Sequence, residues 1–487
     1  MKATDSATAV PGTSVFSFGP RRGIFVNVVD ELAARGPALS DDDLGHFLVL
    51  DHAYRALCAI LYNYVPGSGH PGGSISSGRF VQAVLFDALD YDLSNPDAPG
   101  ADLLSYAAGH KALGLYALWA LRNEVARIGN PDLLPASDVQ QLRLEDLLGF
   151  RRNLINDTPL MRQFHARALD GHPTPATPFV KLATGASGVG IAASFGLALG
   201  AIDIYREKAP RVHVVEGEGG MTPGRVAEAF AAAGTMGLRN LVVHVDWNQA
   251  SIDSNRVCRD GAEPGDYVQW DPVEFAYLHD WNVILVPDGK DYQQIVAAQH
   301  RALAMDNGQP TAIVYRTVKG WEYGIEGRAS HGAGHKLCAS GFYDAVAPLL
   351  KDRLSEVPRC EGDAQRCRAA IPGSSRAATG KRCKPSGTCS PATAPPWMRC
   401  ARDWRRPDRG LPSARAHPGR TRPMSARCTS CARRTRAIHP RSSCSNRARR
   451  RRCAGRWPTC SITSTAYPAA ACWLPLRIWP DPRRSAT

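Results

Sequence analysis

Apolar positions in the first third of the chain recur at helical spacing. Over residues 47–64 they fall three or four positions apart, which predicts an amphipathic helix. The glycine- and proline-rich segment PGSGHPGG at 66–73 predicts the end of that helix. Two further helices are expected over 80–89 and 110–125. Residues 1–45 are only weakly periodic, so we expect an irregular N-terminal extension there.

From Thr184 onward, short β-rich runs alternate with helical stretches. The predicted strands are 211–216, 241–246, 283–286 and 312–315, with helices over 225–235 and 292–305. This alternation predicts an α/β fold, a doubly wound parallel sheet flanked by helices. Such sheets bind ligands at the carboxyl ends of their strands. The apolar run 191–204 is short for a membrane span and contains Asp203, so a buried helix is expected there.

The order of the chain is lost after Arg359, where Arg, Pro, Ser, Ala and Cys dominate. This segment holds 29 of the 59 Lys and Arg residues but 5 of the 45 Asp and Glu, a net charge of +24. The residues before it carry −10, which gives no electrostatic footprint for nucleic acid. Two explanations stay open: a disordered basic tail, or translation in a shifted frame of a GC-rich gene. Its 11 unpaired cysteines, out of 14 in the chain, favour the second.

Cysteine usage in the first part indicates a reducing compartment. Only Cys58, Cys258 and Cys338 precede Arg359, which is too few for a disulfide framework, so a cytoplasmic location is expected. The N-terminus lacks a basic start followed by an apolar run, and no secretory signal is expected. Within the tail, the CxxC at 428–431 has no second pair at zinc-finger distance, and we interpret it as incidental.

The segment Gly217–Gly220 (GEGG) follows a predicted strand and precedes a predicted helix. Glycines there let backbone N–H groups approach a phosphate, and a helix N-terminus favours negative charge. Glu218 beside that phosphate suits a divalent ion that bridges the two. About 30 residues later Asn248 ends the next strand, and its carbonyl is a ligand that suits Mg²⁺. Alone, these residues fit equally well a glycine turn and an asparagine cap in any βαβ unit.

The surroundings of this motif resemble transketolases. A Gly-Asp-Gly followed by Asn some 30 residues later is the signature of thiamine-diphosphate enzymes, and the stretch 217–253 is similar to that part of a transketolase. Further segments that resemble the family occur in its order: GSGHPGG with His70, AAGHKALGLYAL with His110, DGHPTP with His172, TGASGVG at 184–190, and Ser330-His331-Gly332. The resemblance covers roughly 45–345. It implies a thiamine-diphosphate-binding domain over 46–350, followed by the tail over 359–487.

The resemblance implies thiamine diphosphate and Mg²⁺ as cofactors. Glu218 and Asn248 would ligate Mg²⁺ through their side chains and Ala250 through its backbone carbonyl. The residues implied in cofactor binding are His110, Gly185, Ser187, Gly217, Gly219 and Asn248. His70, His172 and His331 would be catalytic, facing the substrate channel, where a histidine pKa suits proton transfer.

The sequence departs from the family at three positions. Glu218 stands for an Asp, Pro223 for a Glu that helps to couple active sites across the dimer, and Ser187 for a Leu, which suggests a divergent branch. The family also takes a glutamate that activates the cofactor from a second domain. That domain should follow residue 345 or so, and we identify no candidate for this glutamate after Arg359.

The expected function is therefore that of a transketolase-like chain. The ancestral reaction is transfer of a two-carbon ketol unit between sugar phosphates, and we expect a truncated chain that is inactive alone. The alternatives are a deoxyxylulose-phosphate synthase, a 2-oxo-acid dehydrogenase E1 component, or the N-terminal subunit of a split transketolase. The expected partners are a sugar phosphate or another keto substrate and a second copy or a separate C-terminal-half subunit. No membrane and no specific nucleic acid are expected.

Overall fold

The computed structural model describes residues 19–64, 69–152, 157–185, 187–250, 270–323, 326 and 339–350. All of them fall in one compact unit, Met1–Arg415. The predictions for His331 and for the segment after Arg359, including the CxxC at 428–431, lie outside the described residues.

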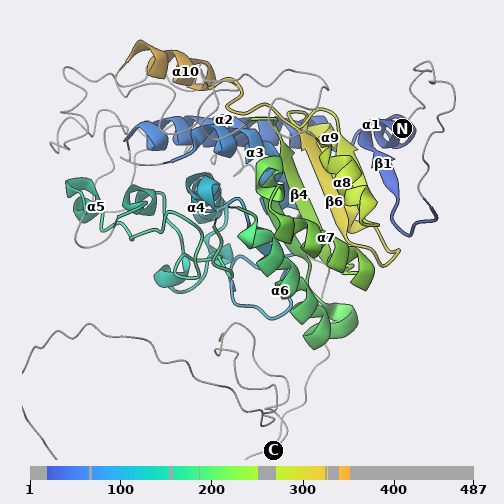
Figure 1. Cartoon of the computed structure of the whole chain (residues 1–487). Coiled ribbons are helices and arrows are strands. Elements are labelled where there is room, and N and C mark those ends of the chain that lie inside the picture. Colours follow the sequence, from blue (N-terminus) through green and yellow to red (C-terminus); the bar gives the residue numbers. More distant parts are fainter. Residues whose placement is uncertain are drawn as a thin grey trace, which may run out of the picture. The chain divides into compact units, whose positions relative to one another are not determined.

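A six-stranded parallel sheet forms the centre of the described fold (Figure 1). Its strands are β1 (Phe25–Asn27), β2 (Leu103–Tyr106), β3 (Val212–Gly217), β4 (Leu241–Trp247), β5 (Asn282–Val286) and β6 (Thr311–Arg316). Their order is β1-β5-β6-β4-β3-β2, and every neighbouring pair is parallel. Strands β3, β4 and β6 are buried along nearly their whole length, as expected when helices cover both faces. The predicted α/β class is confirmed.

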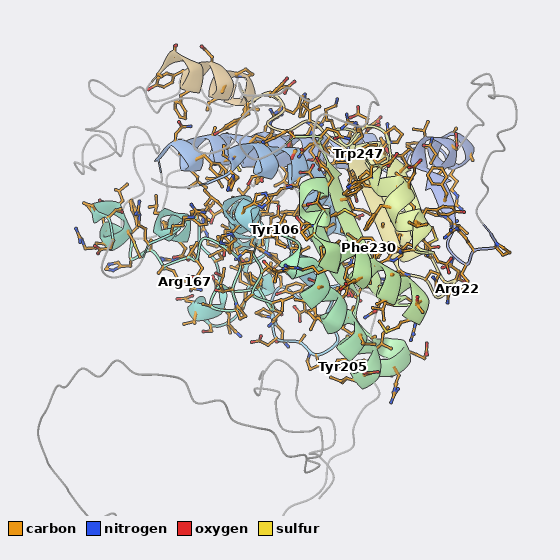
Figure 2. All side chains as sticks on the ribbon, in the orientation of Figure 1. Arg22, Tyr106, Arg167, Tyr205, Phe230 and Trp247 are labelled. Atoms are coloured by element: carbon orange, nitrogen blue, oxygen red, sulfur yellow. The ribbon has the colours of Figure 1, made fainter. Side chains whose placement is uncertain are left out.

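Helices form two layers on the sheet. One layer contains α6 (Val189–Tyr205), α7 (Gly224–Met236) and α8 (Pro272–Leu278), which lie together in front of the strands in Figure 1. The other contains α3 (Pro71–Ala83) and α9 (Tyr292–Leu303), with α2 (Asp41–Tyr64) and α4 (Ala112–Gly129) packed on α3. The remaining α-helices are α1 (Val28–Arg35), α5 (Pro159–Gln163) and α10 (Ser340–Leu350). Large side chains such as Tyr106 and Phe230 fill the interior between the layers (Figure 2).

The direction of the strand order reverses between β4 and β6. The chain passes from β2 to β3 to β4 in one direction, crosses to β5, and returns to β6 beside β4. Helix α7 connects β3 to β4 and helix α9 connects β5 to β6, so these right-handed connections lie on opposite faces of the sheet. A crevice for ligands is therefore expected at the carboxyl ends of β4 and β6.

Two sequence predictions in the N-terminal part were wrong. The extension expected to be irregular contains β1, α1 and the start of α2 within its described part. Strand β1 has three residues, too few to show a period, and its pairing with β5 lies some 260 residues away in sequence. The helix expected over 80–89 begins at Pro71, because proline at the first helical position is already set for a helix. Small residues of α3 hid its apolar period: a Cβ built on Gly78 would lie 2.5 Å from Cε1 of Tyr54.

The apolar run 191–204 lies in α6, which is longer than predicted. Two described helical stretches, Asp41–Asn63 and Val189–Lys208, are long and apolar enough to span a membrane by length and composition alone. The first belongs to α2 and is mostly buried in the domain. The second was expected to be a buried helix, yet only one side is buried, including Ile191 and Phe195, while Val189 and Ile204 are exposed. The reason is that α6 covers one face of the sheet at the outside of the domain.

Candidate cofactor site

Glu218 and Asn248 lie side by side at the carboxyl ends of two neighbouring strands. The register of β3 and β4 places Gly217 opposite Asp246, so the residues that follow both strands emerge at the same edge. Glu218 opens a 3₁₀ turn and Asn248 follows β4 directly. The backbone N–H of Asn248 donates to Oε2 of Glu218 over 3.3 Å. Both side chains are buried. The structure thus brings the two predicted metal-ligating side chains together.

The oxygen atoms of this pair fit a divalent cation. Oε1 of Glu218 is buried and accepts no hydrogen bond from the described residues. Oδ1 of Asn248 accepts from the N–H of Ala250 over 3.1 Å and keeps a second lone pair. Burial raises the pKa of Glu218 to about 7, and the nearby Asp246 raises it further. A cation placed between these oxygens would favour the ionised carboxylate and satisfy the unpaired oxygen. The described residues hold no group of three or more His, Cys, Asp or Glu suited to a metal. A Mg²⁺ site built with substrate phosphates uses one or two carboxylates and needs no such group.

Asp246 forms a polar centre behind this pair that sequence analysis did not single out. Its carboxylate is completely buried. Oδ2 accepts from Nζ of Lys111 over 2.5 Å, from Oγ of Ser76 over 2.6 Å and from Nδ2 of Asn248 over 3.2 Å. The hydroxyl of Thr317, just after β6, donates to Oδ1. Asp246 therefore fixes the amide of Asn248 and joins β4 to β6 at the reversal of strand order.

The glycines of the turn after β3 leave room for a carboxyl group. The N–H of Gly217 donates to Oε1 of Glu216 over 2.9 Å. A Cβ built on Gly220 would lie 2.3 Å from Cδ of Glu216, so a side chain at this position would collide with it. Burial raises the pKa of Glu216 to about 7. Gly219, between these residues, is half-buried and available for the contact that the resemblance assigns to it.

The loop at 184–190 lies against this turn. Gly188 has a left-handed backbone with φ of 72°, and a Cβ built on it would lie 2.7 Å from the carbonyl oxygen of Gly220. Ser187 is exposed and is also left-handed, with φ of 62°. Nothing lies within 4 Å of a Cβ built on Gly185, so there is open space beside it. Gly185 and Ser187 are thus near the predicted clamp, while Ala186 lies outside the described residues.

Three of the four predicted histidines gather next to that loop. The rings of His70 and His110 meet edge to face with centroids 5.0 Å apart. A Cβ built on Gly109 would lie 2.9 Å from Cδ2 of His172 and 3.2 Å from Cα of Gly185. Burial lowers the pKa of His110 well below its usual value, and Lys111 lowers it further. Burial and then Arg151 lower the pKa of His172. His110 and His172 are therefore neutral at pH 7 and can each donate one N–H and accept one proton.

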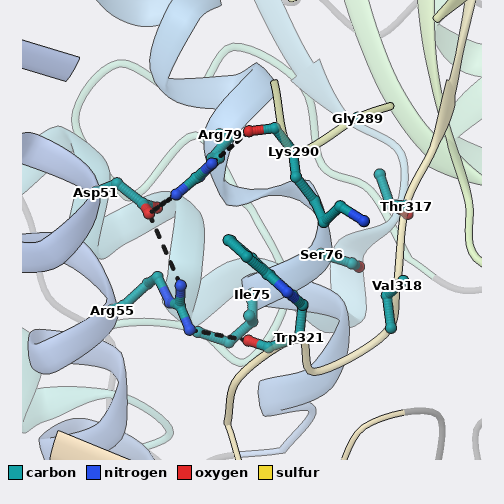
Figure 3. Close-up of a pocket in the computed structure, with 10 residues that line it drawn as sticks. All are labelled: Asp51, Arg55, Ile75, Ser76, Arg79, Gly289, Lys290, Thr317, Val318 and Trp321. Carbon is teal, nitrogen blue, oxygen red and sulfur yellow. Dashed lines mark hydrogen bonds and ion pairs between the residues drawn. The ribbon is translucent and has the colours of Figure 1, made fainter. Parts of the chain in front are cut away.

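A small pocket opens on the far side of Asp246 (Figure 3). It is lined by Asp51, Arg55, Ile75, Ser76, Arg79, Gly289, Lys290, Thr317, Val318 and Trp321. The guanidinium groups of Arg55 and Arg79 lie 4.7 and 4.6 Å from the ring centroid of Trp321 and both pair with Asp51. None of the predicted site residues lines it. Ser76 and Thr317 connect the two places, because both donate to Asp246.

The described fold is an α/β domain whose candidate site lies where ligands bind in such sheets. Residues 137–340 match the family model described as the transketolase, thiamine diphosphate binding domain. The chain therefore carries a thiamine-diphosphate-binding domain of the transketolase family, as the resemblance predicted.

Curated relatives are similar over the same part of the chain. Transketolase-like protein 2 from Bos taurus is 33% identical over 270 residues, and transketolase from Mus musculus is 30% identical over 270 residues. Each alignment covers 55% of this chain and 36% of the relative, so the chain spans about a third of the length of these proteins. The solved transketolase from Leishmania mexicana aligns with 62% of this chain and 41% of its own, at 24% identity and a TM-score of 0.47.

Proposed function

We propose that the described domain binds thiamine diphosphate together with Mg²⁺ at the ends of β3 and β4. One observation carries the proposal: a buried carboxylate, Glu218, keeps an oxygen without a hydrogen-bond partner among the described residues, directly beside Asn248. Leaving a buried charged acceptor unsatisfied costs about 1–3 kcal/mol or more, so such an atom points to a missing cation. The family match over 137–340 supports thiamine diphosphate as the phosphorylated ligand.

The residues around this pair would divide the work of binding. Glu218 and Asn248 would hold Mg²⁺ with their side chains and Ala250 with its carbonyl. The turn at Gly217 and Gly219 would offer backbone N–H groups to the diphosphate. His110 would donate to it as a neutral imidazole, since its pKa is lowered. Gly185 and Ser187 would lie against the cofactor from the neighbouring loop.

When bound, thiamine diphosphate supplies the nucleophilic carbon and the electron sink of the reaction. The chain's own contribution near the substrate would come from histidines. His172 is half-exposed and has a lowered pKa, so it is ready to accept a proton at neutral pH. His70, whose ring contacts that of His110, would hold a hydroxyl of the substrate. His331 keeps its proposed role from the resemblance alone.

The proposed reaction of the complete enzyme is transfer of a two-carbon ketol unit between sugar phosphates. The chain spans about a third of its transketolase relatives, and we identify no activating glutamate after Arg359. We therefore propose that it acts in the cytoplasm as a homodimer or with a separate subunit that supplies the second half, and is inactive alone.

The binding proposal is tested by calorimetric titration of the full chain with thiamine diphosphate in the presence of Mg²⁺. Asn248→Ala should weaken binding about tenfold or more, because it removes a metal ligand. Asn130→Ala is the matched control, since Asn130 caps a 3₁₀ turn away from the site. Equal affinities of the wild type and Asn248→Ala would remove the clamp assignment.

A further inference from the structure

Lys111 places a buried ammonium group at the candidate site. It follows His110 directly, at the junction between a 3₁₀ turn and α4. Only 3% of its side chain is exposed. Its aliphatic stem packs on the first turn of α3, where a Cβ built on Gly73 would lie 2.8 Å from Cε of Lys111. The glycine therefore provides the space through which this side chain reaches the interior.

The ammonium group has more donors than the carboxylate of Asp246 uses. Nζ lies 2.5 Å from Oδ2 of Asp246, its hydrogen-bond partner among the described residues, and an ammonium carries three N–H donors. A Cβ built on Gly217 would lie 3.8 Å from Nζ. The remaining donors are thus next to the last residue of β3, where the glycine turn begins.

Charge at this place argues for a role beyond pairing with Asp246. Three buried carboxyl groups, on Glu216, Glu218 and Asp246, lie around this end of β3 and β4, and Lys111 acts electrostatically on both glutamates. Buried ion pairs are weak sources of stability, because desolvation offsets the attraction. A diphosphate brings further negative charge, and a fixed ammonium would stabilise it strongly where water is excluded.

We propose that Lys111 is a second cation of the diphosphate site, which donates to the diphosphate of thiamine diphosphate beside the metal ion. This inference rests on the proposed function. Asp246 holds the ammonium in place, and the same Oδ2 accepts from Nδ2 of Asn248. One carboxylate oxygen therefore orients both the ammonium and the amide of a proposed metal ligand.

The test compares two variants that differ only in the lysine. Substituting Lys111 alone would leave Asp246 as an unpaired buried charge, which is strongly destabilising. We therefore compare Asp246→Asn with Lys111→Met/Asp246→Asn in the full chain, by titration with inorganic pyrophosphate and with thiamine diphosphate, each with Mg²⁺. The double variant should bind both ligands about tenfold or more weakly than Asp246→Asn. Binding of thiamine, which lacks phosphate, should be the same for both.

Further controls separate the possible failures. Lys181→Met removes a cation whose partner, Asp97, is mostly exposed, and should leave both affinities unchanged. If thermal melting shows that the double variant is unfolded, Lys111→Gln/Asp246→Asn gives the same comparison while retaining a donor. Equal pyrophosphate and thiamine diphosphate affinities with and without the lysine would overturn the role of Lys111 alone. Failure of the wild type to bind thiamine diphosphate with Mg²⁺ would overturn the proposed function, and this inference with it.

Discussion

At the residue scale, the exchange of the family's Asp for Glu218 has a structural account. The longer side chain uses Oε2 to accept from the backbone of Asn248 and leaves Oε1 free among the described residues. The sequence could predict Glu218 and Asn248, because a glycine turn and a strand end are local features. Lys111 and Asp246 could not be predicted as a pair, because they are 135 positions apart and nothing local marks a lysine as buried.

This account predicts opposite effects of Glu218→Gln on stability and on binding. Without ligands at pH 8, the variant should be more stable than the wild type by about 1 kcal/mol, since it removes a buried charge with an unpaired oxygen. In the presence of Mg²⁺ it should bind thiamine diphosphate about tenfold or more weakly, since the amide is a poorer metal ligand. Thermal melting with and without both ligands measures the two effects. A variant that is less stable without ligands, or that binds normally, would contradict the account.

At the element scale, the strands with long apolar runs were predictable and the short ones were not. β3, β4, β5 and β6 all lie close to their predicted positions, because five to seven β-forming residues between helices give a clear pattern. β2 has four residues and was missed, as was β1. Helix α3 is buried on nearly every side, so its small residues carry no amphipathic period.

The packing of α3 predicts opposite effects of the same substitution at two glycines. Gly78→Ala should destabilise the domain by about 1–3 kcal/mol, because the new methyl would meet the ring of Tyr54. Gly45→Ala, inside α2 where nothing lies within 4 Å of the added Cβ, should stabilise it by about 0.5–1 kcal/mol. Chemical unfolding of both variants provides the comparison. A Gly78→Ala protein as stable as Gly45→Ala would show that α3 does not pack on α2 in this way.

A row of polar side chains across the sheet predicts how stability depends on pH. Nδ1 of His213 lies 3.0 Å from Nε2 of His244, whose Nδ1 lies 3.0 Å from the hydroxyl of Tyr315. Burial and the neighbouring His213 lower the pKa of His244 well below 6.5. The native state therefore keeps His244 uncharged, whereas the unfolded chain binds a proton as the pH falls through about 6.5. The stability contributed by the neutral ring is complete above that pH and is lost below it.

Between pH 8 and pH 5.5 this residue should therefore cost the wild type about 1.4 kcal/mol of unfolding free energy. His244→Phe should be less stable at pH 8, because Tyr315 and His213 lose a partner, but its further loss on acidification should be smaller by about that amount. His165→Asn, at an exposed position, should lose stability as the wild type does. An identical pH dependence in the wild type and His244→Phe would show that His244 is not held neutral.

At the scale of the whole molecule, the described residues account for a cofactor-binding half. The family model covers 137–340, and the chain spans about a third of its curated transketolase relatives. The fold class and the pairing of Glu218 with Asn248 were predictable because several motifs occur in the family's order. The roles of the site residues and the extent of the domains stay predictions.

The full chain alone should therefore bind the cofactor without turnover. A coupled assay with a ketose-phosphate donor and an aldose-phosphate acceptor should show no ketol transfer, because we identify no glutamate to activate the cofactor. Addition of a separate chain that carries the missing half should restore activity. Turnover by the chain alone that is abolished in Asn248→Ala would contradict this prediction and place the activating group within these 487 residues.

The two explanations of the segment after Arg359 differ in the coding DNA. Eleven cysteines and a net charge of +24 favour a shifted reading frame. We expect another frame over codons 345–380 to continue with alternating strand and helix patterns. If neither other frame does so, the basic tail is genuine, and its affinity for nucleic acid should then fall steeply with salt.

The central claim is that Glu218 and Asn248 hold a metal ion for a diphosphate, and a crystal structure of the full chain with thiamine diphosphate and Mg²⁺ tests it most directly. The account predicts one ion at about 2.0–2.1 Å from an oxygen of Glu218, Oδ1 of Asn248, the carbonyl of Ala250 and two diphosphate oxygens. A diphosphate bound elsewhere, or an ion at this edge of the sheet that does not contact Glu218, would contradict it.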